Sequence, residues 1–65
     1  MLQREKELLE KIIKNIKSYQ EQKFETYLIL VYIDGVITLT QNNLSDEFIQ
    51  KIYLIRYYIK LGKKI

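Results

Sequence analysis

The sequence predicts an α+β fold with the element order helix–β-hairpin–helix (αββα), completed by homodimerisation. An Asp34-Gly35 pair in the middle of the apolar run 24–40 indicates the hairpin, and helical patterns lie on both sides of that run. All 65 residues are assigned to a single small domain. A chain of this length buries only about 60% of its unfolded surface, which favours reinforcement by a partner subunit.

The N-terminal residues 2–20 are predicted to form an amphipathic helix. The spacing of their apolar side chains is typical of one helical face, interrupted by Glu5. The face consists of Leu2, Leu8, Leu9, Ile12, Ile13, Ile16 and Tyr19. Residues 20–23 are polar and are expected to form the connection to the next element.

The run 24–40 is predicted to form the hairpin. Asp-Gly suits a two-residue type I′ turn, whose two central residues both need positive φ. In this pairing Ile29, Val31 and Ile33 share one face of the ribbon, and the other face is also apolar. A ribbon of two strands is marginal alone. We therefore expect the helices to cover one face and a second copy to cover the other; the alternative is that both helices wrap the ribbon within a monomer.

A second helix is predicted at residues 46–61, followed by a basic tail at 62–65. Ser45 is the expected N-cap, and the acidic side chains that follow it suit the positive end of the helix dipole. One apolar face carries Phe48, Ile52, Ile55 and Ile59. The opposite side, which should be polar, carries Tyr53, Leu54, Tyr57, Tyr58 and Leu61. Together with Ile29, Val31 and Ile33, these side chains are the candidate interface residues.

Several kinds of chemistry are missing from the sequence. Without Cys or His, the chain lacks thiolate zinc ligands, disulfides and the commonest general base. Two glycines are too few for a phosphate-binding or dinucleotide-binding loop. Among the candidate carboxylates, Asp34 lies in the expected turn and Asp46 and Glu47 lie in the first turn of the expected second helix, so no shared cleft is implied. The sequence therefore predicts no catalytic residue, no metal and no cofactor.

The positive charge is concentrated at the C-terminal end. The net charge is only +3, but residues 51–65 contain five basic side chains and no acidic one. Beside the tyrosines these cations are candidate nucleic-acid contacts, since basic groups neutralise phosphates and aromatic rings stack on bases. They are Lys51, Arg56, Lys60, Lys63 and Lys64.

The leading functional hypothesis is a small non-enzymatic interaction protein, a regulator or inhibitor that binds another macromolecule as a homo-oligomer, with a dimer favoured. The alternative is a small dimeric DNA- or RNA-binding protein. A membrane-surface role is disfavoured, since packing on the hairpin accounts for the apolar stripe of the second helix. A cytoplasmic or host-cytoplasmic location is the default expectation. The composition, rich in Ile, Lys and Tyr, is in keeping with a virus or mobile element.

Overall fold

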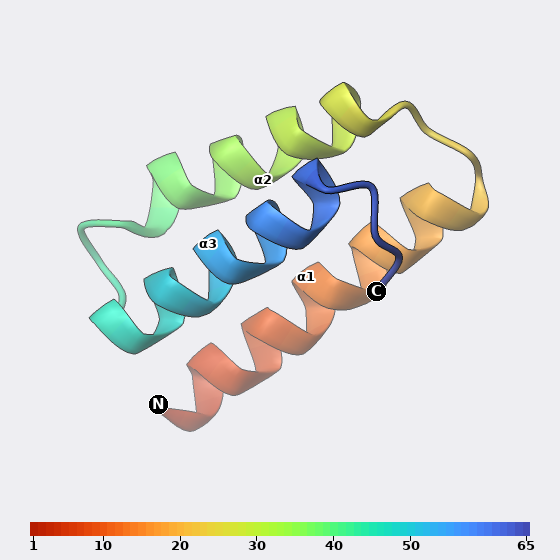
Figure 1. The fold of residues 1–65 in the computed structure, drawn as a ribbon. Coiled ribbons are helices and arrows are strands. Elements are labelled where there is room, and N and C mark those ends of the chain that lie inside the picture. The colour runs from red at the N-terminus through yellow and green to blue at the C-terminus, as the bar shows by residue number, and fades with distance from the viewer.

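Three α-helices and no strand make up the protein in a computed structural model that describes residues 1–65. They are α1 (Gln3–Glu21), α2 (Thr26–Thr40) and α3 (Asp46–Lys60). α1 and α3 run in the same direction, and α2 runs antiparallel to both (Figure 1). The bundle measures 31 × 17 × 16 Å along its principal axes.

The predicted α+β fold and its β-hairpin are wrong, because residues 26–40 form one continuous helix, with Asp34 and Gly35 inside it. Residues 29, 33 and 37 are all isoleucine, and this spacing of four places them on one helical face, where they are 3%, 0% and 6% exposed. An apolar run without regular polar positions cannot be assigned to helix or strand by periodicity alone. Packing of that isoleucine row against the other helices therefore outweighs the local turn signal.

Polar groups within α2 are also satisfied in the helical conformation. The Thr38 hydroxyl donates to the Asp34 carbonyl at 2.9 Å, and the Thr40 hydroxyl donates to the Val36 carbonyl at 2.7 Å. The Asp34 carboxylate accepts a hydrogen bond from Arg56 Nε of α3 at 2.7 Å. The aspartate expected in a turn thus joins two helices.

The core lies along the axis where the three helices meet. Each helix contributes aliphatic or aromatic side chains from one face, all 6% exposed or less: Ile12 and Ile16 from α1, Ile29, Ile33 and Ile37 from α2, and Phe48, Ile52 and Ile59 from α3. The core is closed within one chain. The expectation that a second copy covers one face of the hairpin is wrong, because no hairpin forms.

Glu5 is buried at the shared N-terminal end of α1 and α3, with 2% of its surface exposed. Its carboxylate accepts hydrogen bonds from the Leu2 backbone amide at 3.1 Å, from the Ser45 amide at 2.8 Å and from the Ser45 hydroxyl at 3.0 Å. The bonds from Ser45 and Leu2 lower the pKa of Glu5 below its ordinary value, against the opposing effect of burial. The residue that interrupts the apolar stripe of α1 therefore ties two helix N-termini together.

The helix ends follow established capping patterns. The Ser45 hydroxyl accepts a hydrogen bond from the Phe48 amide at 3.3 Å, as the expected N-cap does. α3 ends in a Schellman motif around Gly62, which has φ of 81°. α1 ends in the same motif, but its left-handed residue is Lys23, with φ of 62°. A side chain with a Cβ is strained in this conformation.

Candidate interaction surfaces

The outer surfaces of the three helices differ in chemistry. The outer side of α1 is covered with exposed charged residues: Arg4, Lys6, Glu7, Glu10, Lys11, Lys14, Lys17 and Glu21. The exposed large apolar side chains lie mostly on the other two helices. After contributing to the core, α2 and α3 therefore still present apolar surface to solvent, whereas α1 is an ordinary amphipathic helix.

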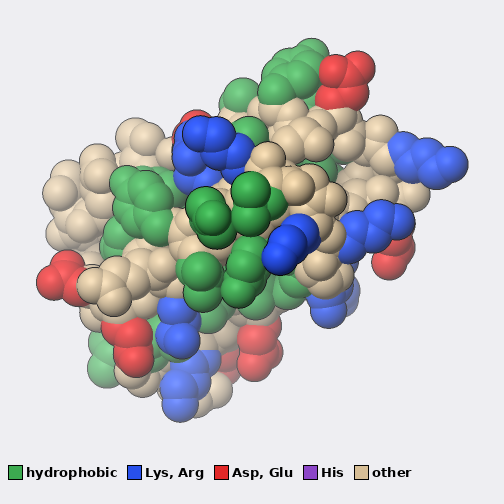
Figure 2. Space-filling model, viewed as in Figure 1, with side chains coloured by type: hydrophobic (Ala, Val, Ile, Leu, Met, Phe, Trp, Pro, Cys, Tyr) green, Lys and Arg blue, Asp and Glu red, His purple; other side chains and the backbone are tan.

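We define the α3 face as Tyr53, Leu54, Tyr57, Tyr58 and Leu61. These side chains follow three- and four-residue spacing on the side of α3 opposite the core, and each is between 41% and 56% exposed. In the view of Figure 2, apolar side chains gather over the position of α3, with Lys and Arg around them. The structure thus leaves these five predicted interface residues accessible.

The three candidate interface residues of the run 24–40 do not lie on one face. Ile29 and Ile33 are core residues and cannot reach a partner. Val31 is 64% exposed on the outer side of α2. The assignment of Ile29 and Ile33 followed from the two-residue period of a strand, which does not apply to a helix.

The outer side of α2 carries other exposed apolar residues that the hairpin interpretation missed as a group. Tyr27, Leu28 and Leu39 are 60%, 45% and 77% exposed. Leu39 borders a hollow of about 220 Å³ between α1 and α2, where Asn15 Nδ2 donates to the Tyr32 hydroxyl at 3.1 Å. The signal that could have found this surface is the helical spacing of apolar residues on both sides of Gly35.

The five candidate nucleic-acid contacts do not form one basic surface. Arg56 is paired with Asp34 of α2, which raises the pKa of the guanidinium through the hydrogen bond and the charge. Lys60 follows Arg56 by four residues, so it lies on the same side of α3, which faces α2. Lys51 precedes Tyr58 by seven residues, so it lies on the side of α3 that faces α1. The α3 face separates these two groups.

The other two cations belong to the C-terminal tail, which is held against α1. Gln20 Nε2 donates to the Lys63 carbonyl at 3.1 Å, and the Ile65 amide donates to Gln20 Oε1 at 3.2 Å. The Lys63 ammonium lies 5.7 Å from the centre of the Tyr58 ring, in the range of a cation–π contact. Lys63 therefore adds positive charge at the α1 side of the α3 face.

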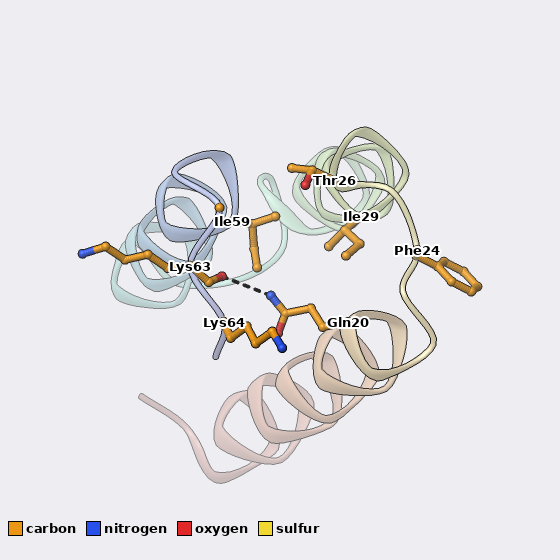
Figure 3. A pocket seen from close by; sticks show the side chains of 8 residues that line it. Gln20, Phe24, Thr26, Ile29, Ile59, Lys63 and Lys64 are labelled. Carbon is orange, nitrogen blue, oxygen red and sulfur yellow. Dashed lines mark hydrogen bonds between the residues drawn. The ribbon is translucent and has the colours of Figure 1, made fainter.

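A hollow of about 160 Å³ lies at this end of the bundle. Figure 3 shows Ile29 and Ile59 facing each other across it, with Gln20 below them and the Lys63 side chain directed away. Lys64 also lines it, but no buried polar group points into the space without a partner. The hollow lacks the convergent polar groups of a small-molecule site.

Two further features bear on possible partners and chemistry. No three acidic side chains come together as a possible metal site. No helix of the bundle combines the length and apolar character needed to cross a lipid bilayer.

Comparison of the chain with protein-family models, curated proteins and solved structures finds no match.

Proposed function

We propose that the protein is a non-enzymatic interaction protein, a regulator or inhibitor that binds another macromolecule through the α3 face and acts as a homo-oligomer. The observation that supports it is the exposure of five large apolar side chains on a helix whose other face already fills the core. Apolar patches of this kind commonly mark association surfaces. Tyrosine is enriched at such interfaces because it buries a large ring and keeps a hydrogen-bonding hydroxyl.

The charges beside the α3 face indicate the chemistry of its partner. Lys51 and Lys63 lie on one side of the face, and Lys60 lies on the other. A partner protein with apolar side chains flanked by acidic groups would bury the tyrosines and pair with these lysines. Lysines at the rim would chiefly accelerate association and select against basic proteins, whereas the apolar centre would provide most of the affinity.

Nucleic acid is the second candidate partner, and the contact of Lys63 with Tyr58 favours it. A cation beside an aromatic ring is suited to a phosphate next to a stacked base. The pairing of Arg56 with Asp34 counts against it, since that guanidinium is already engaged. The salt response separates the candidates: affinity for nucleic acid should fall steeply as salt rises, and affinity for a protein bound through tyrosines should change little.

The test is site-specific photo-crosslinking followed by affinity measurement. A photo-crosslinking amino acid is placed at Tyr57 in one variant and at Lys14, on the charged side of α1, in a matched control. We expect one defined partner to crosslink from Tyr57 and not from Lys14. The partner is then purified and titrated against the native chain and Tyr57→Glu.

We expect Tyr57→Glu to weaken binding by at least about tenfold, because it places a charge in the middle of an apolar contact. Tyr57 is exposed, so the substitution should leave the helical circular dichroism spectrum unchanged. Equal crosslinking from Tyr57 and Lys14, or an affinity that Tyr57→Glu does not alter, would contradict the proposal.

A further inference from the structure

The outer side of α2 has an unusual arrangement about its glycine. Val31, Gly35 and Leu39 are spaced four residues apart, and we call them the Gly35 row. Leu39 and Val31 are the two most exposed large apolar side chains of the chain, at 77% and 64%. A Cβ atom added to Gly35 would meet nothing within 4 Å. The helix therefore presents an open position in its exposed surface, with an apolar side chain one turn before it and one turn after it.

We propose that the Gly35 row is a self-association surface, on which a second copy of the chain packs so that the two α2 helices cross at Gly35. When the two helices run antiparallel, a twofold axis through this point places Val31, four residues before the glycine, opposite the partner's Leu39, four residues after it. Symmetry then makes the same contact twice. Rows of residues four apart on both helices pack together at a crossing angle of about −50°.

The charge distribution favours a second copy as the occupant. Residues 26–40 contain no Lys or Arg, and their one acidic side chain, Asp34, is already paired with Arg56 of the same chain. Two such faces meet without like charges opposite each other. Two α3 faces would instead bring their flanking lysines together. α2 itself therefore offers no positive charge with which to attract anionic lipids or nucleic acids, and Lys11 of α1 is the one cation that borders the hollow beside Leu39.

The surface area explains why a glycine is useful at the crossing. A specific interface buries about 800 Å² per partner, which is about one sixth of the 4837 Å² exposed by this chain. Val31 and Leu39 alone are too small to supply that area. Without a side chain at the crossing, the helices can approach more closely than the usual 8–10 Å or so. Tyr27 and Leu28 then come into contact, and the hollow beside Leu39 can receive the partner's Val31.

The inference rests on the homo-oligomer of the proposed function and assigns its contact to α2, leaving the α3 face free. The test is sedimentation of the native chain and of variants between about 1 µM and about 1 mM. We expect a monomer–dimer equilibrium in the native chain. Gly35→Leu should raise the dissociation constant at least about tenfold, because a side chain at the crossing separates the helices.

Gly35→Leu also separates loss of the dimer from loss of the fold. Leucine favours the helix more than glycine does, so at a concentration where both chains are monomeric the variant should melt at a higher temperature than the native chain. Val31→Lys should likewise raise the dissociation constant at least about tenfold, because it places an unpaired charge against the partner's Leu39. Gln3→Lys, which adds the same charge on α1, is the matched control and should leave the dimer unchanged.

The two surfaces are distinguished by Tyr57→Glu, which should leave the dimer intact and weaken binding of the purified outside partner at least about tenfold. A chain that is monomeric at every concentration would overturn the inference, as would a dimer that Gly35→Leu and Val31→Lys do not weaken. A monomer whose binding to phosphatidylcholine vesicles falls with Val31→Lys would assign the row to a lipid surface. If both Gly35→Leu and Val31→Lys also lost the crosslinked outside partner, α2 and α3 would form a single binding surface. That result would also overturn the inference.

Discussion

Replacement of Gly35 by alanine should stabilise the protein. Gly35 lies inside α2, is exposed, and has open space where its Cβ would be placed. Glycine in a helix interior is about 0.8–1.0 kcal/mol less favourable than alanine, because it loses more backbone freedom on folding. The free energy of unfolding should rise by about that amount. For a domain of this size, 1 kcal/mol corresponds to roughly 4–8 °C in Tm.

The only other glycine, Gly62, is the matched control. A Cβ there would also meet nothing within 4 Å, but φ is 81°. Gly62→Ala places a Cβ in the left-handed conformation, which costs roughly 1–2 kcal/mol. The two substitutions add the same methyl group in equally open surroundings and should change the free energy of unfolding in opposite directions.

The assay is thermal unfolding followed by far-ultraviolet circular dichroism, at a concentration low enough for the chain to be monomeric. The result also tests the fold itself. In a type I′ hairpin turn Gly35 would have positive φ, and alanine would destabilise it. A lower Tm for Gly35→Ala would therefore refute the helical placement of residues 26–40 and the reasoning based on it.

Three more predictions concern the core, the buried carboxylate and the α1 C-terminus. Ile33→Ala should lower the free energy of unfolding in urea by about 2–5 kcal/mol, and Val31→Ala by no more than about 0.5 kcal/mol; equal losses would contradict the helical placement of these two residues. The folded-state pKa of Glu5 is depressed, so its stabilisation is present above about pH 4.5 and is lost as pH falls through the lowered pKa. As pH is lowered, the urea concentration at the midpoint of unfolding should therefore fall less in Glu5→Gln than in the native chain or the exposed control Glu7→Gln. Equal dependence on pH in all three proteins would contradict the role of Glu5. Lys23→Gly should raise the free energy of unfolding by about 1 kcal/mol in thermal melts, because it relieves the positive φ, and an unchanged or lower Tm would contradict that strain.

The hydrogen-bond partner of the buried carboxylate could not be predicted from the sequence. Glu5 stands out in the sequence only as an interruption of an apolar stripe. Its function depends on Ser45, which is forty residues away and reaches it only because α1 and α3 start at the same end of the bundle. A polar residue on an apolar face can signal a buried hydrogen-bonding site, but the sequence does not identify its partner.

The candidate surfaces were predicted unevenly for a related reason. The α3 face follows from spacing within one well-capped helix, so the exposure of Tyr57 and its neighbours could be inferred from sequence. The α2 surface was assigned with the wrong period, which placed Ile29 and Ile33 beside Val31. Lys60 and Lys51 could be located only once α2 and α1 were known to lie on either side of α3.

The sequence by itself determined the features that depend on neighbouring residues: the amphipathic first helix, the Ser45 cap, the glycine-terminated last helix and the lack of Cys and His chemistry. Only the tertiary structure decided the conformation of residues 26–40. An apolar run has no regularly spaced polar residues to show which side faces solvent, so its sequence does not distinguish helix from strand. Asp-Gly favours a turn locally, but the packing of the helix stabilises the fold by more than that local preference. Burial of three isoleucines against α1 and α3 made that run a helix and left Gly35 on its outer surface.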